Sequence, residues 1–154
     1  MKLAVNIFIF LLLNFTALAI GGLFTGDGVA SDWYSTLNKA PWTPPGWVFG
    51  LAWTAIMICY SFYMAILYKR NDRRKKIITL YAAQLLFNIS WNPLFFYLQN
   101  ALIALFAILF LTIIVAYLLF HYQKTMRWTS LLILPYFIWL CIATSLNLYI
   151  LVYN

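Results

Sequence analysis

Charged residues divide the chain into long apolar segments, and these segments predict its secondary structure. Four uncharged runs cover residues 3–26, 40–68, 77–123 and 128–154. A membrane-spanning helix needs about 20 apolar residues at a rise of about 1.5 Å each. Every run therefore holds one helix except 77–123, which is long enough for two and is broken near Gln99 and Asn100. We expect an all-α integral membrane protein, a single domain over residues 1–154 built as a five-transmembrane-helix bundle. The expected spans are about residues 3–24, 47–68, 77–98, 101–121 and 129–152.

The N-terminal segment also has some features of a signal peptide. Lys2, an apolar run and the small residues of Ala17-Leu18-Ala19 imitate one with a cleavage site. The apolar run continues to Phe24, beyond the usual length of such a signal. We therefore expect an uncleaved first span, with cleavage as the alternative.

Residues 25–46 form the one long connection between the predicted spans. Connections of this length in compact proteins are usually lids, binding loops or disordered linkers. Prolines restrict this segment, and its large aromatic side chains favour burial or an interface, so a flexible linker is disfavoured. Residues 33–38 could form a short helix with Asp32 as its N-cap. Two interpretations stay open: a structured lid over a binding site, and an aromatic belt at the level of the lipid headgroups.

Composition and charge placement support a membrane location and predict an orientation. The chain is 66% hydrophobic and only 8% charged, whereas a soluble domain carries about 25% charged residues. Its net charge is +7. With five alternating spans, every Lys and Arg except Lys39 lies on the side of the N-terminus, which the positive-inside rule places in the cytoplasm. We therefore expect loop 25–46 and the C-terminus outside, and the basic run 69–76 at the lipid headgroups rather than on nucleic acid.

Amides are the main polar groups inside the predicted spans. No Asp, Glu, Lys or Arg falls within a predicted membrane core, which argues against ion-coupled transport and against a carboxylate metal site. Gln84, Asn88 and Asn92 recur at every fourth position and therefore share one helix face. Lipid cannot satisfy them, so this face must point into the bundle or a cavity. Hydrogen bonding between helices and the lining of a pocket both remain open.

Aromatic residues follow the same helical spacing. Trp139, Ala143 and Asn147 recur at every fourth position in the last span. In the second span Gly46 and Gly50 have the GxxxG spacing that permits close helix approach, although the motif alone is weak. An aromatic-walled cavity with a few amides would suit a planar, largely apolar ligand. An ordinary packed core is the alternative explanation of the aromatic stripe.

Together these residues resemble the TspO/MBR family of tryptophan-rich sensory proteins, whose animal members are the mitochondrial translocator proteins. The resemblance covers residues 21–147 in the order and spacing of the family. Its segments are Gly21-Gly22, Trp33-Tyr34-x-x-Leu37-x-Lys39-x-Pro41-Trp42-x-Pro44-Pro45 with Gly50-x-x-Trp53, Gln84-Leu85-x-x-Asn88-x-x-Trp91-x-Pro93-x-Phe95-Phe96, and Pro135-Tyr136-x-x-Trp139-x-x-x-Ala143-Thr144-x-Leu146-Asn147.

The resemblance implies a five-helix membrane protein, commonly a homodimer, with a pocket closed by the loop between helices 1 and 2. It implies porphyrin ligands, protoporphyrin IX or haem, and no obligatory cofactor. In some bacterial members two tryptophans promote light-dependent porphyrin breakdown, and these match Trp53 and Trp139. Lys39 is our own candidate for pairing with a propionate, with a membrane-boundary role as the alternative. Pattern and resemblance together predict these ligand-binding residues: Trp33, Tyr34, Lys39, Trp42, Trp53, Asn88, Trp91, Trp139, Ala143 and Asn147.

The expected function is therefore that of a porphyrin-binding sensory protein of a bacterial cell membrane, with slow photo-oxidative chemistry as an open question. One alternative is a passive translocator of porphyrin or another lipophile. A second alternative is a ligand-responsive regulator with no chemistry of its own. Sterol binding through a C-terminal element is doubtful, because Tyr149 and Tyr153 are not followed by the Lys or Arg of the sterol pattern.

Overall fold

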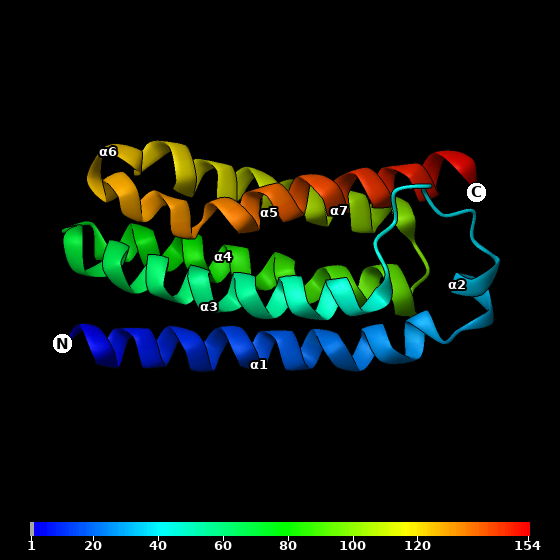
Figure 1. Cartoon of the computed structure of the whole chain (residues 1–154), viewed down its shortest axis with the longest axis horizontal. Coiled ribbons are helices and arrows are strands. Elements are labelled where there is room, and N and C mark those ends of the chain that lie inside the picture. The colour runs from blue at the N-terminus through cyan, green and yellow to red at the C-terminus, as the bar shows by residue number, and fades with distance from the viewer. Residues whose placement is uncertain (1) are drawn as a thin grey trace.

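The computed structural model describes residues 2–154, and within this range the chain is helical and contains no strand. Five long helices run side by side along the length of the molecule (Figure 1). They are α1 (Leu3–Val29), α3 (Gly46–Arg70), α4 (Arg74–Asn92), α5 (Ala101–His121) and α7 (Leu134–Tyr153). The shorter elements are α2 (Asp32–Thr36), the π-helix η1 (Pro93–Tyr97), α6 (Gln123–Met126) and the 3₁₀-helix η2 (Arg127–Leu132). The predicted all-α class is confirmed.

Four of the described helices are long and apolar enough to cross a membrane, namely α1, α3, α5 and α7. The region of the third predicted span is different, because α4 begins with three basic residues and continues at Pro93 into η1. The backbone bond from Leu98 N to Pro93 O, 2.9 Å long, spans five residues and is of the π-helical kind. In the turn that follows, Asn100 N donates to Leu94 O at 3.1 Å.

Helix α1 is longer than the first predicted span. Residues 25–29, which were expected in the loop, continue the helix to Val29. Thr25 Oγ1 bonds both to Gly21 O at 3.0 Å, within α1, and to Asn92 Oδ1 at 2.7 Å, on α4. The bond from Thr25 to Asn92 thus joins the last turns of α1 to the end of α4. The connection from α1 to α3 is therefore residues 30–45, and we call it the α1–α3 connection.

Two further boundaries differ from prediction. The cap of α2 is Ser31, whose side chain accepts a hydrogen bond from Tyr34 N at 3.2 Å, so the assignment of Asp32 as the cap was wrong by one residue. Asp32 is instead the first helical residue. At the other end of the chain, residues 127–132 form a 3₁₀-helix, and α7 begins only at Leu134 with a proline in its first turn.

A buried polar network joins three helices in the apolar interior. Tyr81 OH of α4 donates to Asn14 Oδ1 of α1 at 2.8 Å, and Asn14 Nδ2 donates to Ser61 Oγ of α3 at 2.8 Å. Ser61 Oγ in turn bonds to Met57 O at 2.6 Å. Asn14 is completely buried, so these bonds replace the water that the membrane interior cannot provide.

Helix α1 approaches the π-helix at one glycine. A methyl group on Gly28 would lie 2.3 Å from the nearest ring carbon of Phe96. Any larger side chain would separate the two elements, so glycine is needed here for close packing. The contact holds η1 against α1 at the end of the bundle covered by the α1–α3 connection.

Candidate ligand-binding cavity

A cavity of about 700 Å³ lies inside the bundle, and its lining includes Tyr34 and Lys39 of the α1–α3 connection. Figure 1 shows this connection, with α2, crossing one end of the bundle. The walls of the cavity come from α1, α3, α4, η1, α5 and α7. Ligand pockets typically measure about 300–1,000 Å³ and combine apolar walls with a few polar groups. The cavity therefore has the size and position expected for a site under the loop.

The α1–α3 connection is tied to α7 by side-chain bonds. Asn38 N donates to Asn154 Oδ1 at 2.7 Å, and Asn154 Nδ2 donates back to Asn38 O at 3.2 Å. Trp42 Nε1 donates to Ser145 Oγ at 3.2 Å, and its ring meets Tyr149 edge-on with centroids 5.5 Å apart. These contacts attach the connection to α7 across the end of the bundle.

Two side chains of this connection reach the cavity together. Lys39 Nζ lies 4.5 Å from the centroid of the Tyr34 ring, within range of a cation–π interaction. Burial raises the pKa of the Tyr34 phenol above its ordinary value of 10.0. The phenol is therefore neutral at physiological pH and can donate a hydrogen bond beside the lysine charge.

The two tryptophans that match the family pattern come from different helices, and both line the cavity. Trp53 of α3 packs edge-on against Tyr136, with centroids 5.9 Å apart. Trp139 of α7 packs edge-on against Phe49, with centroids 5.3 Å apart. Trp139 Nε1 is buried and has no hydrogen-bond partner within residues 2–154.

The three amides of α4 have different environments, although they share a face. Gln84 is completely buried, and its Nε2 donates to Tyr136 OH at 2.8 Å. Asn92 Oδ1 accepts from Thr25 at 2.7 Å. Asn88 lies between them, lines the cavity, and forms no side-chain hydrogen bond with any described residue. Both interpretations of the amide stripe therefore apply, at different positions along one helix.

Trp91 and Asn147 form a wall rather than free polar groups. Trp91 Nε1 donates to Asn147 Oδ1 at 3.0 Å, and Asn147 Nδ2 donates to Ala101 O at 2.8 Å. The Trp91 ring stacks on Phe95 with centroids 5.2 Å apart. This pair fixes α4 against α7 and the start of α5, and it presents mainly aromatic surface to the cavity.

The structure brings most of the predicted ligand-binding residues together. The residues that line the cavity are Tyr34, Lys39, Trp53, Asn88, Trp91, Trp139, Ala143 and Asn147. Trp33 and Trp42 do not line it. Trp33 packs edge-on against Phe95 with centroids 5.5 Å apart, and Trp42 is 54% exposed beside α7. These two tryptophans support the connection from outside the cavity.

Sequence reasoning missed several glycines that enlarge the cavity. Gly22 and Gly26 of α1 and Gly46 and Gly50 of α3 are exposed, line the cavity, and have no atom within 4 Å of a Cβ position. Within the described chain, Gly46 and Gly50 therefore do not bring α3 into close contact with another helix. A spacing motif alone does not distinguish a glycine that faces another helix from one that faces empty space.

The comparisons with known proteins agree over nearly the whole chain. Residues 9–153 match the model of the TspO/MBR family. The tryptophan-rich sensory protein of Cereibacter sphaeroides is 36% identical over 138 residues, covering 89% of this chain and 87% of that protein. The tryptophan-rich protein TspO of Archaeoglobus fulgidus is 35% identical over 160 residues, covering 100% and 97%. The human translocator protein is 27% identical over 143 residues, covering 88% and 85%. With its apolar helices, the chain is therefore an integral membrane protein that belongs to the TspO/MBR family.

Proposed function

We propose that this protein binds a porphyrin, protoporphyrin IX or haem, in the cavity under the α1–α3 connection. The observation that carries the proposal is the position of Asn88, an amide without a partner in the part of the chain that the structure describes. It lies in a cavity that also has Trp53 and Trp139 in its walls. Indole faces offer stacking surface to a planar macrocycle, and a free amide can bond to its polar groups.

Lys39 is the proposed partner of a porphyrin propionate. It lines the cavity from the α1–α3 connection and is the only basic residue that the sequence places on this side. Lys39 Nζ contacts the Tyr34 ring, and no carboxylate forms an ion pair with it among residues 2–154. A charge-assisted bond to a propionate would orient the macrocycle with its acidic edge toward the connection.

The proposed photochemistry involves the two cavity tryptophans. An electron-rich indole can quench or react with a photoexcited porphyrin, so Trp53 and Trp139 are the proposed reactive side chains. The activity would be slow and would depend on light. Relatives carry the names sensory protein and translocator protein, neither of which states a reaction.

A passive translocator is the second candidate function. The exposed cavity glycines of α1 and α3 favour it, because empty space beside each glycine is consistent with a side opening toward lipid. A porphyrin could pass through such an opening without ion coupling. A regulator that responds to the ligand and alters a partner would need no such opening.

The proposed topology has five spans, with α4 and η1 together forming the third. Helix α4 contributes 19 residues and η1 five, enough to cross a hydrocarbon core of about 30 Å. The N-terminus, the α3–α4 turn and α6 lie at one end of the bundle, opposite the α1–α3 connection (Figure 1). We place that basic end in the cytoplasm of a bacterial cell and the other end outside. A cysteine introduced at Arg73 should resist an impermeant reagent in intact cells, and efficient labelling would overturn this orientation.

The family resemblance also supports a homodimer. Cross-linking of the full chain in lipid nanodiscs should trap a dimer at low protein-to-disc ratios. A chain that remains monomeric in both nanodiscs and mild detergent would contradict the proposal.

Porphyrin binding is tested by titrating the purified protein with protoporphyrin IX and following tryptophan fluorescence and the Soret band. Asn88→Leu has a similar volume but no polar group, and it should weaken binding about 5- to 30-fold, the cost of about 1–2 kcal/mol for a lost hydrogen bond. Lys39→Gln should weaken protoporphyrin IX binding more than binding of its dimethyl ester. Unchanged affinity in Asn88→Leu would remove the amide from the site.

Light-dependent chemistry is tested by illuminating the complex and following loss of the Soret band. Trp53→Phe and Trp139→Phe should each slow bleaching, whereas Trp47→Phe provides a control because Trp47 is 71% exposed and lies outside the cavity. Equal bleaching in all three variants and in a detergent blank would exclude tryptophan chemistry. Binding without bleaching would then leave the sensor and the translocator, which porphyrin flux into liposomes separates.

A further inference from the structure

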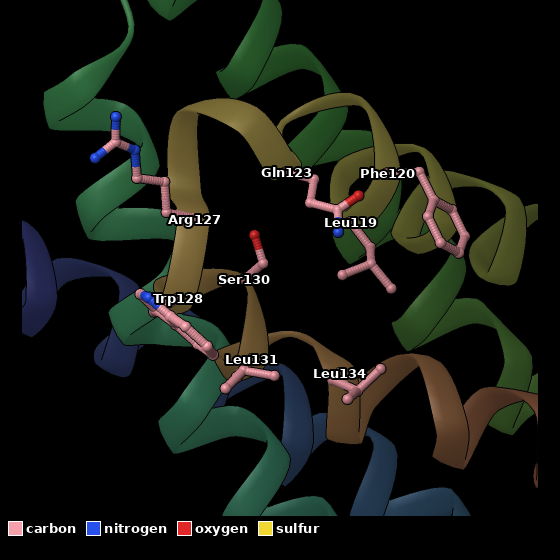
Figure 2. A pocket seen from close by; sticks show the side chains of 8 residues that line it. All are labelled: Leu119, Phe120, Gln123, Arg127, Trp128, Ser130, Leu131 and Leu134. Carbon is pink, nitrogen blue, oxygen red and sulfur yellow. The ribbon is translucent and has the colours of Figure 1, made fainter.

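A second hollow lies at the opposite end of the bundle, where α5 turns into α7. It measures about 500 Å³ and is lined by both polar and apolar side chains (Figure 2). The lining residues are Leu119, Phe120, Gln123, Arg127, Trp128, Ser130, Leu131 and Leu134. None of them lines the cavity under the α1–α3 connection, so this hollow needs an explanation of its own.

Ser130 is the first sign of a ligand in this hollow. It is only 7% exposed, and its Oγ has no hydrogen-bond partner among the described residues. Figure 2 shows the hydroxyl oxygen directed into the space between Gln123 and the turn that carries Arg127. A buried hydroxyl without a partner is costly and indicates that another group satisfies it.

The rim of the hollow combines positive charge with exposed apolar surface. Arg127 is exposed, and its guanidinium extends outward from the hollow without an ion pair in residues 2–154 (Figure 2). Arg70 Nη1 donates to Met126 O at 3.3 Å and Thr129 Oγ1 at 3.2 Å, which places a second guanidinium against the same turn. Trp128 is 85% exposed, as expected of an aromatic anchor at the lipid interface.

The apolar part of the hollow continues toward the membrane. Phe120 is 62% exposed and Leu131 58% exposed, on α5 and η2 respectively. Phe120 also packs edge-on against Phe137 of α7, with centroids 5.8 Å apart. An acyl chain could lie along this surface while its headgroup stays at the basic rim.

We propose that this hollow binds one anionic phospholipid of the surrounding bilayer, with the phosphate at Arg127 and an ester carbonyl accepting from Ser130 and Gln123. Charge complementarity selects this occupant. Every Lys and Arg except Lys39 lies at the N-terminus, around the α3–α4 turn, or between α5 and α7, and the sequence pattern predicts these three segments on the same side of the membrane. Asp72 is the only acidic residue among them. An exposed guanidinium at the lipid surface attracts an anionic headgroup both by charge and by paired N–H donors.

Native mass spectrometry of the full chain in neutral detergent tests the proposal, with phosphatidylglycerol as the probe and phosphatidylcholine as the reference. The first phosphatidylglycerol should bind about tenfold more tightly than phosphatidylcholine. Arg127→Gln should weaken it about 50-fold, because both a charge and a charge-assisted hydrogen bond are lost. Lys124→Gln is the matched control, since Lys124 is exposed on the same turn but outside the hollow. Lys124→Gln should weaken phosphatidylglycerol binding only roughly fivefold, the effect of one surface charge.

Two further measurements separate a built site from general attraction. Ser130→Ala should weaken both lipids by about 2- to 10-fold, because the ester carbonyl is common to them. Inorganic phosphate should not displace the bound lipid, since it lacks the acyl chain. Equal losses in Arg127→Gln and Lys124→Gln would overturn the proposal in favour of unspecific surface attraction. Efficient displacement by inorganic phosphate would also overturn it, and unchanged thermal unfolding of the variants excludes misfolding as the cause.

Discussion

Replacement of Gly28 by alanine tests the packing of α1 on the π-helix. The added methyl carbon would lie 2.3 Å from Phe96 Cδ1 and 2.4 Å from both Cβ and Cγ of the same residue. Rotation of the ring cannot clear Cβ, which is bonded directly to the backbone. Either α1 or η1 must therefore move by about 1 Å to restore van der Waals contact.

The magnitude follows from comparison with another glycine on the same helix. Overpacking usually costs about 1–3 kcal/mol, and a rigid clash of three atoms belongs at the upper end, about 3 kcal/mol. Alanine in a helix is favoured over glycine by about 1 kcal/mol, which applies to both positions. Gly22 has no atom within 4 Å of its Cβ position, so Gly22→Ala carries the benefit without the clash. We expect Gly28→Ala to be less stable than Gly22→Ala by about 3 kcal/mol.

Thermal unfolding of both variants in the same detergent measures this difference. For a chain of this size 1 kcal/mol shifts Tm by about 2–4 °C, so the two variants should differ by about 6–12 °C. Porphyrin affinity should also fall in Gly28→Ala, because Phe96 lines the cavity and must move. Equal Tm values for the two alanine variants would refute the reasoning, since they would show that α1 and η1 are not in close contact in the folded protein.

Two other perturbations test contacts on α7. Asn154→Ala removes both bonds to the Asn38 backbone, so the Asn38 amide should exchange with deuterium about fivefold faster, corresponding to about 1 kcal/mol of lost local stability. Tyr136→Phe removes the partner of Gln84 Nε2 and should lower the free energy of unfolding by about 1–2 kcal/mol. Tyr60→Phe is its matched control, because the Tyr60 hydroxyl is buried without a partner in the described chain, and chemical denaturation should show no loss of stability.

Each of these two predictions has a result that would contradict it. Unchanged exchange in Asn154→Ala would mean that the α1–α3 connection is held by Trp42 and its neighbours alone. A larger loss of stability in Tyr60→Phe than in Tyr136→Phe would contradict the hydrogen-bond assignment of Gln84. Neither measurement, hydrogen exchange or chemical denaturation, requires a bound ligand.

The helices were largely predictable because charged residues end the apolar runs, and a bilayer requires runs of nearly constant length. The side chains that these helices bring into contact were not predictable. Gln84 and Asn88 share a helix face, yet one lies in the packed interior and the other in the cavity, because about 6 Å along the axis is enough to change the environment. Periodicity gives direction around a helix but carries no information about depth.

The α1–α3 connection was predictable as a structured segment but not in its contacts. Its aromatic residues indicated burial, and both Trp33 and Trp42 do pack against other rings. They face η1 and α7 rather than the cavity, because the path of the backbone is set by bonds to Ser145 and Asn154, distant in sequence. Short-range preferences of proline and tryptophan cannot encode such distant partners.

The π-helix at Pro93–Tyr97 decides where this part of the chain can lose a residue. A π-turn contains more residues than the α-turn that it replaces, so removal of a single residue from this segment would restore ordinary helical winding. Because the π-turn winds its extra residue into nearly the same rotation, the side chains before and after such a deletion would keep about the same directions. The Asn100 cap of α5, whose Oδ1 accepts from Ile103 N at 3.0 Å, would then stay in place. A deletion within α4 would instead turn the side chains before it by about 100° relative to those after it, and a deletion after Asn88 would turn that amide out of the cavity.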